Sequence, residues 1–135
     1  MGDRGNIFFV DQAIDRDTWG GVYLYSHWAG SDLPFLLQRA LDRGRDRWGD
    51  SQYFARILFC EMIRDDVEGL TGFGISSKMW DNEHLVIRVN DLDQIVSFHE
   101  AGREAQRDDE AIKSWSYEEY CDGSPTIDEH WDSHY

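Results

Sequence analysis

The sequence is poor in cysteine, in basic residues and in long apolar runs, and each shortage excludes a class of protein. Two cysteines in 135 residues are too few for a disulfide framework. No apolar run approaches the roughly 20 residues that cross a bilayer as a helix, so no membrane span is expected. The first residues lack the charged and then apolar pattern of a secretory leader. Together these absences predict a cytoplasmic protein in a reducing compartment.

Basic residues are outnumbered, because 13 Lys and Arg stand against 27 Asp and Glu, which gives a formal net charge of −14. A charge of this sign repels the phosphate backbones of nucleic acids and attracts basic proteins or cations. We therefore expect no direct contact with DNA or RNA. Residues 100–135 are more acidic than the rest, with eleven acidic and three basic side chains. The simpler alternative is that these carboxylates only keep the surface solvated.

Large apolar side chains are abundant, since the sequence is 41% hydrophobic and 14% aromatic. This content is typical of a folded chain rather than a disordered one. The length is enough for one core without disulfide or metal staples. We predict a single α+β domain over residues 1–122, followed by an acidic, flexible tail over residues 123–135.

The apolar and β-branched runs predict a mainly antiparallel sheet of about five strands. Residues 6–10 and 22–26 are separated by a polar, turn-rich stretch and are expected to form a hairpin with a long loop. Residues 70–77, 84–90 and 94–99 are separated by shorter turns. They are expected to form a three-stranded meander.

Two central helices are predicted to pack against this sheet. Residues 33–41 carry apolar side chains at helical spacing. Residues 52–64 are apolar around most of the helix circumference, so this second helix is expected to be buried on several sides. Cys60 is then expected inside the core, and Glu61 at the edge of the helix.

The C-terminal part contributes less to the predicted core. Residues 101–113 are polar and lack an apolar stripe, so they are expected to form a surface loop or a frayed helix. Ser116 and Glu119 have the spacing of a capping box, which predicts a last short helix.

Residues 21–34 run from a strand through a glycine turn into a helix, which is a common place for functional side chains. His27 lies where the strand ends, and Ser31 and Asp32 follow closely. These three residues are the candidates for a small hydrolase or ligand-binding enzyme. The alternative that we favour is that His27 and Trp28 hold the turn on the sheet. No nucleophile-elbow, zinc-protease, P-loop or dinucleotide motif supports an enzyme.

The aromatic residues favour an interaction protein instead. The Trp residues fall at predicted loops, turns and element ends, and several have acidic neighbours. Aromatic anchors rimmed by carboxylates suit a surface that docks on a basic protein. For any single Trp, however, we favour the alternative that it closes one end of the core. The residues selected for such a binding surface are Tyr23, Tyr25, His27, Trp28, Trp80, Trp115, Glu118 and Glu119.

The tail offers His130, Asp132 and His134 as ligands for a divalent metal. Their spacing matches no known closed site, and an unconstrained tail of this kind binds metal only loosely. We therefore expect a solvated tail, no metal site and no cofactor.

The sequence also resembles a group of small, uncharacterised proteins of bacterial and phage genomes. The shared features are an N-terminal Gly-Asn strand at residues 2–10, the segment Val-Tyr-Leu-Tyr-Ser-His-Trp-Ala-Gly at residues 22–30, and a helix that begins near Leu33 and Pro34. The resemblance covers about the first 100 residues. No activity is known for that group, so the resemblance implies only a bacterial or phage setting.

These observations lead to one preferred hypothesis and two alternatives. The preferred one is a non-enzymatic acidic protein that binds or inhibits a basic partner, such as a nucleic-acid-binding protein. The first alternative is the enzyme centred on His27. The second is a structural or oligomerisation module, and the sequence leaves the oligomeric state open, with a homodimer as one case.

Overall fold

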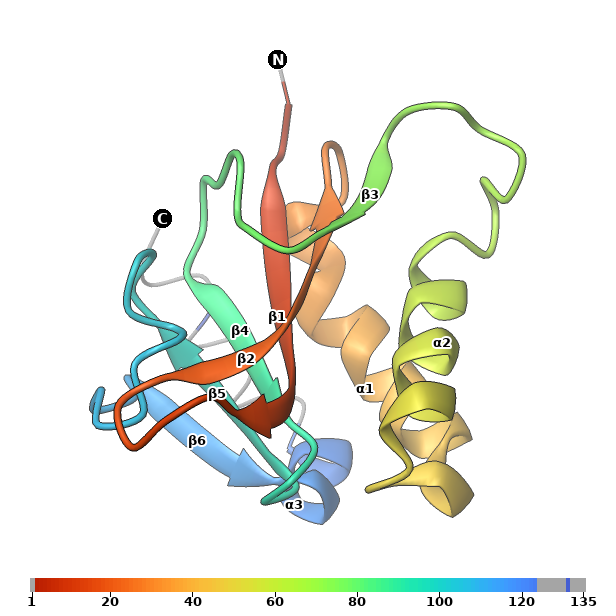
Figure 1. Cartoon of the computed structure of the whole chain (residues 1–135). Coiled ribbons are helices and arrows are strands. Elements are labelled where there is room, and N and C mark those ends of the chain that lie inside the picture. The colour runs from red at the N-terminus through yellow and green to blue at the C-terminus, as the bar shows by residue number, and fades with distance from the viewer. Residues whose placement is uncertain (1, 124–130, 132–135) are drawn as a thin grey trace.

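The computed structural model describes residues 2–123 and residue 131. It is a single α+β domain in which a six-stranded mixed sheet is covered by helices on one face and by loops on the other (Figure 1). The strand order is β3-β2-β1-β4-β5-β6, with β1 and β4 parallel and the other neighbouring strands antiparallel. The strands are β1 (Gly5–Ala13), β2 (Trp19–Ser26), β3 (Phe73–Ser76), β4 (Val86–Asn90), β5 (Ile95–His99) and β6 (Lys113–Ser116), and the helices are α1 (Leu33–Arg43), α2 (Ser51–Met62) and α3 (Tyr117–Asp122).

The predicted N-terminal hairpin is confirmed. Its strands pair from Gly5 opposite Ser26 to Ala13 opposite Trp19, with a bulge between Val10 and Gln12. Residues 5–10 of β1 are buried on both faces of the sheet, and the residues of β2 are buried or half-buried, which explains why these segments are rich in apolar and aromatic residues.

The predicted meander is wrong in its pairing. Residues 73–76 form β3, but β3 pairs with β2, with Ile75 opposite Leu24. The following segment, residues 77–85, crosses β2 and β1 to reach β4 (Figure 1). Strand propensity shows where strands form, but it carries no information about which edge a strand joins, so the partner of β3 was not predictable from spacing.

The sheet has one strand more than predicted, since β6 forms at the end of the polar stretch and pairs with β5, with Trp115 opposite Val96. The capping box that follows is confirmed at the start of α3. The Ser116 hydroxyl accepts a hydrogen bond from Glu119 N at 3.1 Å, and the Glu119 carboxylate accepts one from Ser116 N at 2.8 Å. These bonds satisfy two backbone donors at the helix N-terminus.

Helices α1 and α2 pack together over one face of the sheet and enclose the main core. In α2 the buried apolar side chains Phe54, Leu58 and Met62 recur every four residues and form one stripe, and Ala55, Ile57 and Phe59 are half-buried against the same core. The helix is therefore buried along one stripe and half-buried beside it, which is less than the burial on several sides that was expected. Cys60 is exposed, and Glu61 lies on the buried stripe instead of the edge.

The opposite face carries a smaller apolar cluster, which includes Phe8, Val10 and Tyr23. It lies under the segments that connect the C-terminal strands, so residues 101–113 contribute more to burial than predicted. Most of the predicted tail lies outside the described residues. Trp131 is described, and it is buried against Phe98. No helix within the described part of the chain is long and apolar enough to cross a membrane.

Candidate functional site

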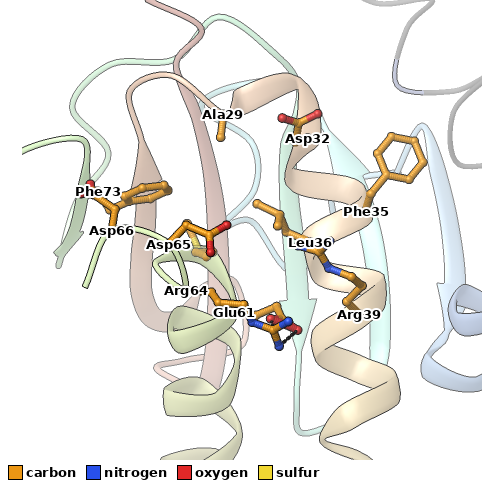
Figure 2. Close-up of a pocket in the computed structure, with 11 residues that line it drawn as sticks. Ala29, Asp32, Phe35, Leu36, Arg39, Glu61, Arg64, Asp65, Asp66 and Phe73 are labelled. Atoms are coloured by element: carbon orange, nitrogen blue, oxygen red, sulfur yellow. Dashed lines mark hydrogen bonds and ion pairs between the residues drawn. The ribbon is translucent and has the colours of Figure 1, made fainter. Parts of the chain in front are cut away.

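A cleft opens between α1, the end of α2 and the start of β3 (Figure 2). Its volume is about 370 Å³. This is the lower end of the range for small-molecule pockets, and it is enough for one or two side chains of a partner. The cleft is lined by Ala29, Asp32, Phe35, Leu36, Arg39, Glu61, Met62, Arg64, Asp65, Asp66 and Phe73.

The walls of the cleft are apolar where they meet the core. Phe35 and Leu36 come from one turn of α1, Met62 from the last turn of α2, and Phe73 from the first position of β3. Leu36 and Phe73 are half-buried and pack against the main core. A ligand in the cleft therefore meets apolar surface that is held by the fold.

The charge of the cleft is acidic and only partly compensated. Glu61 is buried and already paired, with its carboxylate 2.6 Å from the Arg64 guanidinium and 3.7 Å from that of Arg43. Figure 2 marks the contact with Arg64.

The carboxylates of Asp32, Asp65 and Asp66 are exposed, and no ion pair or hydrogen bond joins them to another residue within the described part of the chain. These three carboxylates are available to a cationic group from outside.

A second acidic hollow of about 380 Å³ lies under residues 100–112. Its lining is more polar than that of the first, and one of its carboxylates is committed, because Asp109 binds His99 and lies 3.5 Å from the Arg103 guanidinium. Asp108 and Glu110 are exposed on its rim. The two hollows have a similar volume and the same sign of charge, but only the first has a lining rich in apolar side chains.

Beside this second hollow, Ser97, His99 and Asp109 form a chain of hydrogen bonds. The Ser97 hydroxyl lies 2.7 Å from His99 Nε2, and His99 Nδ1 lies 2.7 Å from the Asp109 carboxylate. This is the order of groups in a nucleophilic triad. However, His99 is fully buried and Ser97 almost so, and burial lowers the pKa of His99. A substrate cannot reach the hydroxyl in this arrangement, so the chain of bonds has a structural role.

Further polar contacts hold the loop at residues 100–112 on the sheet. The Tyr23 hydroxyl donates to the buried Glu104 carboxylate at 2.6 Å. The Arg88 guanidinium donates to the backbone oxygens of Glu104 at 3.1 Å and Gln106 at 3.0 Å. Burial and the Glu104 carboxylate both raise the pKa of Tyr23, so this hydroxyl stays protonated and remains a donor.

The three candidate catalytic residues are not brought together. His27 lines a hollow beside Trp28, Ser31 lines another beside Asp3, and Asp32 belongs to the cleft. The Nδ1 atom of His27 lies 2.8 Å from the Tyr25 hydroxyl. Neither Ser31 nor Asp32 therefore lines the hollow that His27 lines.

The predicted binding residues are spread over the molecule. Tyr23 and Trp115 are buried, so their contacts are with the chain itself. Glu118 is exposed and accepts hydrogen bonds from Arg45 Nη1 at both carboxylate oxygens, and Glu119 closes the capping box. Tyr25, His27 and Trp28 share one shallow hollow, and Trp80 is exposed at the end of β3. Their binding role stays a prediction.

The predicted metal ligands His130, Asp132 and His134 lie outside the described residues. Within residues 2–123 and at residue 131, no cluster of three or more His, Cys, Asp or Glu is placed to hold a metal ion.

Sequence reasoning missed both the cleft and the buried hydrogen-bond chain. The Ser-x-His spacing in residues 97–99 places both side chains on one face of a strand, which was a usable signal. Asp109 was not predictable, because a loop supplies it. For the cleft residues Asp65, Asp66 and Phe73, the sequence pattern predicted only the end of a helix and a strand. It gave no indication that these residues line one cleft.

Comparison of the chain with family models, with curated proteins and with solved structures finds no match. Any function must therefore be inferred from the chemistry of its own residues.

Proposed function

We propose that this protein is an acidic interaction protein whose cleft between α1, α2 and β3 binds a cationic, partly apolar segment of a basic protein. The observation that carries the proposal is an excess of carboxylates around apolar walls. Asp32, Asp65 and Asp66 form no ion pair with another described residue, whereas the cationic groups of the lining are Arg39 and Arg64, of which Arg64 is paired with Glu61. A Lys or Arg side chain fits this combination, because its methylene stem packs on apolar surface while its charged end reaches carboxylates.

The charge of the whole chain supports the same partner. A formal net charge of −14 raises the rate of encounter with basic proteins and repels nucleic acids. Nucleic-acid-binding proteins are basic, so an inhibitor that covers such a surface is the specific form that we propose. The bacterial or phage setting comes from the resemblance over about the first 100 residues.

The hydrolase alternative is less favoured, because His27, Ser31 and Asp32 line three different hollows. The structural alternative gives no reason for unpaired carboxylates around an apolar cleft.

A fluorescent peptide of alternating Lys and Val, about eight residues long, tests the proposal by fluorescence anisotropy at low and high salt. The cleft variant Asp65→Asn with Asp66→Asn should weaken binding by about tenfold. The control variant, Asp108→Asn with Glu110→Gln, removes the same charge from the second hollow and should weaken binding much less.

Equal losses in the two variants would show that only net charge attracts the peptide. Binding that ignores salt, or no binding at low salt, would contradict the proposal outright.

A further inference from the structure

We infer that the partner segment binds as an added β-strand along the open edge of β3, with alternate cationic side chains directed into the cleft. This inference rests on the proposed function and specifies the conformation and sequence pattern of its partner. Strand addition to an exposed sheet edge is a general mode of peptide recognition.

The edge of β3 is open because β3 is the terminal strand of the sheet and, among the described residues, pairs only with β2. The backbone N–H of His27 donates to Gly72 O at 2.8 Å, which fixes the hydrogen-bonded positions of this ladder. Since such positions alternate in an antiparallel pair, Gly74 and Ser76 face β2. Phe73 and Ile75 then direct their N–H and C=O groups to the open edge.

Although β3 is short, it lacks the charged and proline residues that often protect an edge strand. The β3 sequence Phe-Gly-Ile-Ser contains no Lys, no Pro and no charged side chain. Ile75 is 58% exposed, and two exposed tryptophans lie close by in sequence or structure: Trp80 bonds to Ser76 through its ring N–H, and Trp28 lies against Gly72. An edge that is open and flanked by apolar groups is suited to pairing with another chain.

The register connects the edge to the cleft. Phe73 and Ile75 are opposite Ser26 and Leu24, so they lie on the helix-covered face, and Phe73 lines the cleft. A partner residue directly opposite Phe73 projects to the same face. Its side chain then points toward the carboxylates of Asp65 and Asp66. In a strand, every second side chain points to the same face. The partner segment is therefore expected to carry a cationic residue at every second position.

Charge selects a basic partner rather than a second copy of this chain. Two copies would each bring a formal charge of −14 to the interface, and like charges oppose association. The strand is also only four residues long, so backbone pairing alone gives a weak complex. Ion pairs in the cleft supply the rest of the affinity.

The decisive test uses the alternating Lys-Val peptide with methyl groups on selected backbone nitrogens. Methylation removes donors without changing charge. In an added strand only every second N–H faces β3, so methylating one set of residues should weaken binding by about tenfold and methylating the other should have little effect. Sensitivity at Lys indicates an antiparallel strand, and sensitivity at Val a parallel one. Equal effects of the two sets, or none, would overturn the inference.

A protein variant gives a second measurement. Ile75→Pro removes an N–H that faces the open edge and leaves the ladder to β2 intact. It should weaken binding about tenfold, whereas Ile75→Ala, which keeps the N–H, should weaken it less than about threefold. Circular dichroism checks the fold of each variant, and if Ile75→Pro does not fold, the methylated peptides decide on the wild-type protein.

The results separate this inference from the proposed function. Binding could require Asp65 and Asp66 and yet be unaffected by backbone methylation and by Ile75→Pro. This result would support the cleft as the binding site and would contradict the added strand. Concentration-dependent self-association of the protein alone, measured by sedimentation and abolished by Ile75→Pro, would assign the edge to a second copy and overturn the inference.

Discussion

The helix-covered face and the loop-covered face of the sheet are formed by alternate residues of the same strands, but they are closed with different chemistry. On the helix-covered face, aromatic and aliphatic side chains make up most of the packing, as Phe9 and Phe54 do, and the hydrogen bond from Tyr117 to Asp91 is a polar pair within it. On the loop-covered face, a small apolar cluster is joined by buried polar pairs, as between Tyr23 and Glu104.

The stability contributed by the two faces should respond to different kinds of substitution. Apolar packing is non-directional and is weakened by the loss of volume. A buried polar pair is weakened when one partner is removed, because the other then remains desolvated without a hydrogen bond. The loop-covered face should also respond to mild acid, since it holds the buried His99.

The largest effect is expected on the helix-covered face. Phe54→Ala removes a fully buried ring and should lower the free energy of unfolding by about 3–5 kcal/mol. The control Tyr53→Ala changes the neighbouring, exposed residue and should cost less than about 1 kcal/mol. Urea unfolding followed by tryptophan fluorescence measures both. Similar losses in the two variants would show that the ring of Phe54 is not part of a tightly packed core.

A pair of tyrosine variants compares the polar chemistry of the two faces. Tyr23→Phe leaves the Glu104 carboxylate without its phenolic donor and should cost about 1.5–3 kcal/mol. Tyr120→Phe removes a hydrogen bond to Pro34 O, a neutral acceptor on the helix side, and should cost about 0.5–1.5 kcal/mol. Thermal unfolding gives both values. If Tyr120→Phe is the more costly variant, the loop-covered face does not depend on charged hydrogen bonds as proposed here.

The same comparison explains how much was predictable from the sequence. The helix-covered face follows from periodicity: apolar residues at alternate strand positions and at helical spacing predicted the hairpin, both helices and the α+β class. The capping box at Ser116 and Glu119 was predictable because it is local.

The loop-covered face depends on pairs that are far apart in the sequence. Glu104 meets Tyr23 across 81 positions, and a polar stretch gives no signal of which carboxylate will be buried. The pairing of β3 with β2 and the position of Glu61 on the buried side of α2 are long-range outcomes of the same kind. The cleft is formed by α1, α2 and β3, which meet only through long-range packing. Its geometry therefore could not be predicted from local sequence patterns.

A pH series tests the loop-covered face by a third route. Burial lowers the pKa of His99, although Asp109 opposes this and the nearby Arg88 adds to it. The unfolded chain therefore binds a proton at His99 below about pH 6.5 while the folded chain does not, and stability falls as the pH decreases through that region. One such group contributes at most about 1.4 kcal/mol per pH unit.

In His99→Gln this part of the slope between about pH 7 and pH 5 should disappear. The control His27→Gln keeps the buried ring and should retain the slope. Stability curves in urea at several pH values measure it. An unchanged slope in His99→Gln would mean that other groups cause the acid sensitivity.

The smallest change in stability is expected at β3, where the loops no longer cover this face of the sheet. Two glycines of the loop-covered face, Gly21 and Gly74, show the difference in the space around them. At Gly21, inside the sheet, an added Cβ would lie 1.7 Å from Phe9 O, so Gly21→Ala requires the backbone to move. At Gly74, on β3, an added Cβ meets nothing within 4 Å. Gly74→Ala should therefore stabilise the fold by about 0.4–1 kcal/mol, because it restricts the unfolded chain without a clash. Thermal unfolding distinguishes this gain from a loss, and a loss would show that the loops extend over β3 and that its outer part is less open than the contacts indicate.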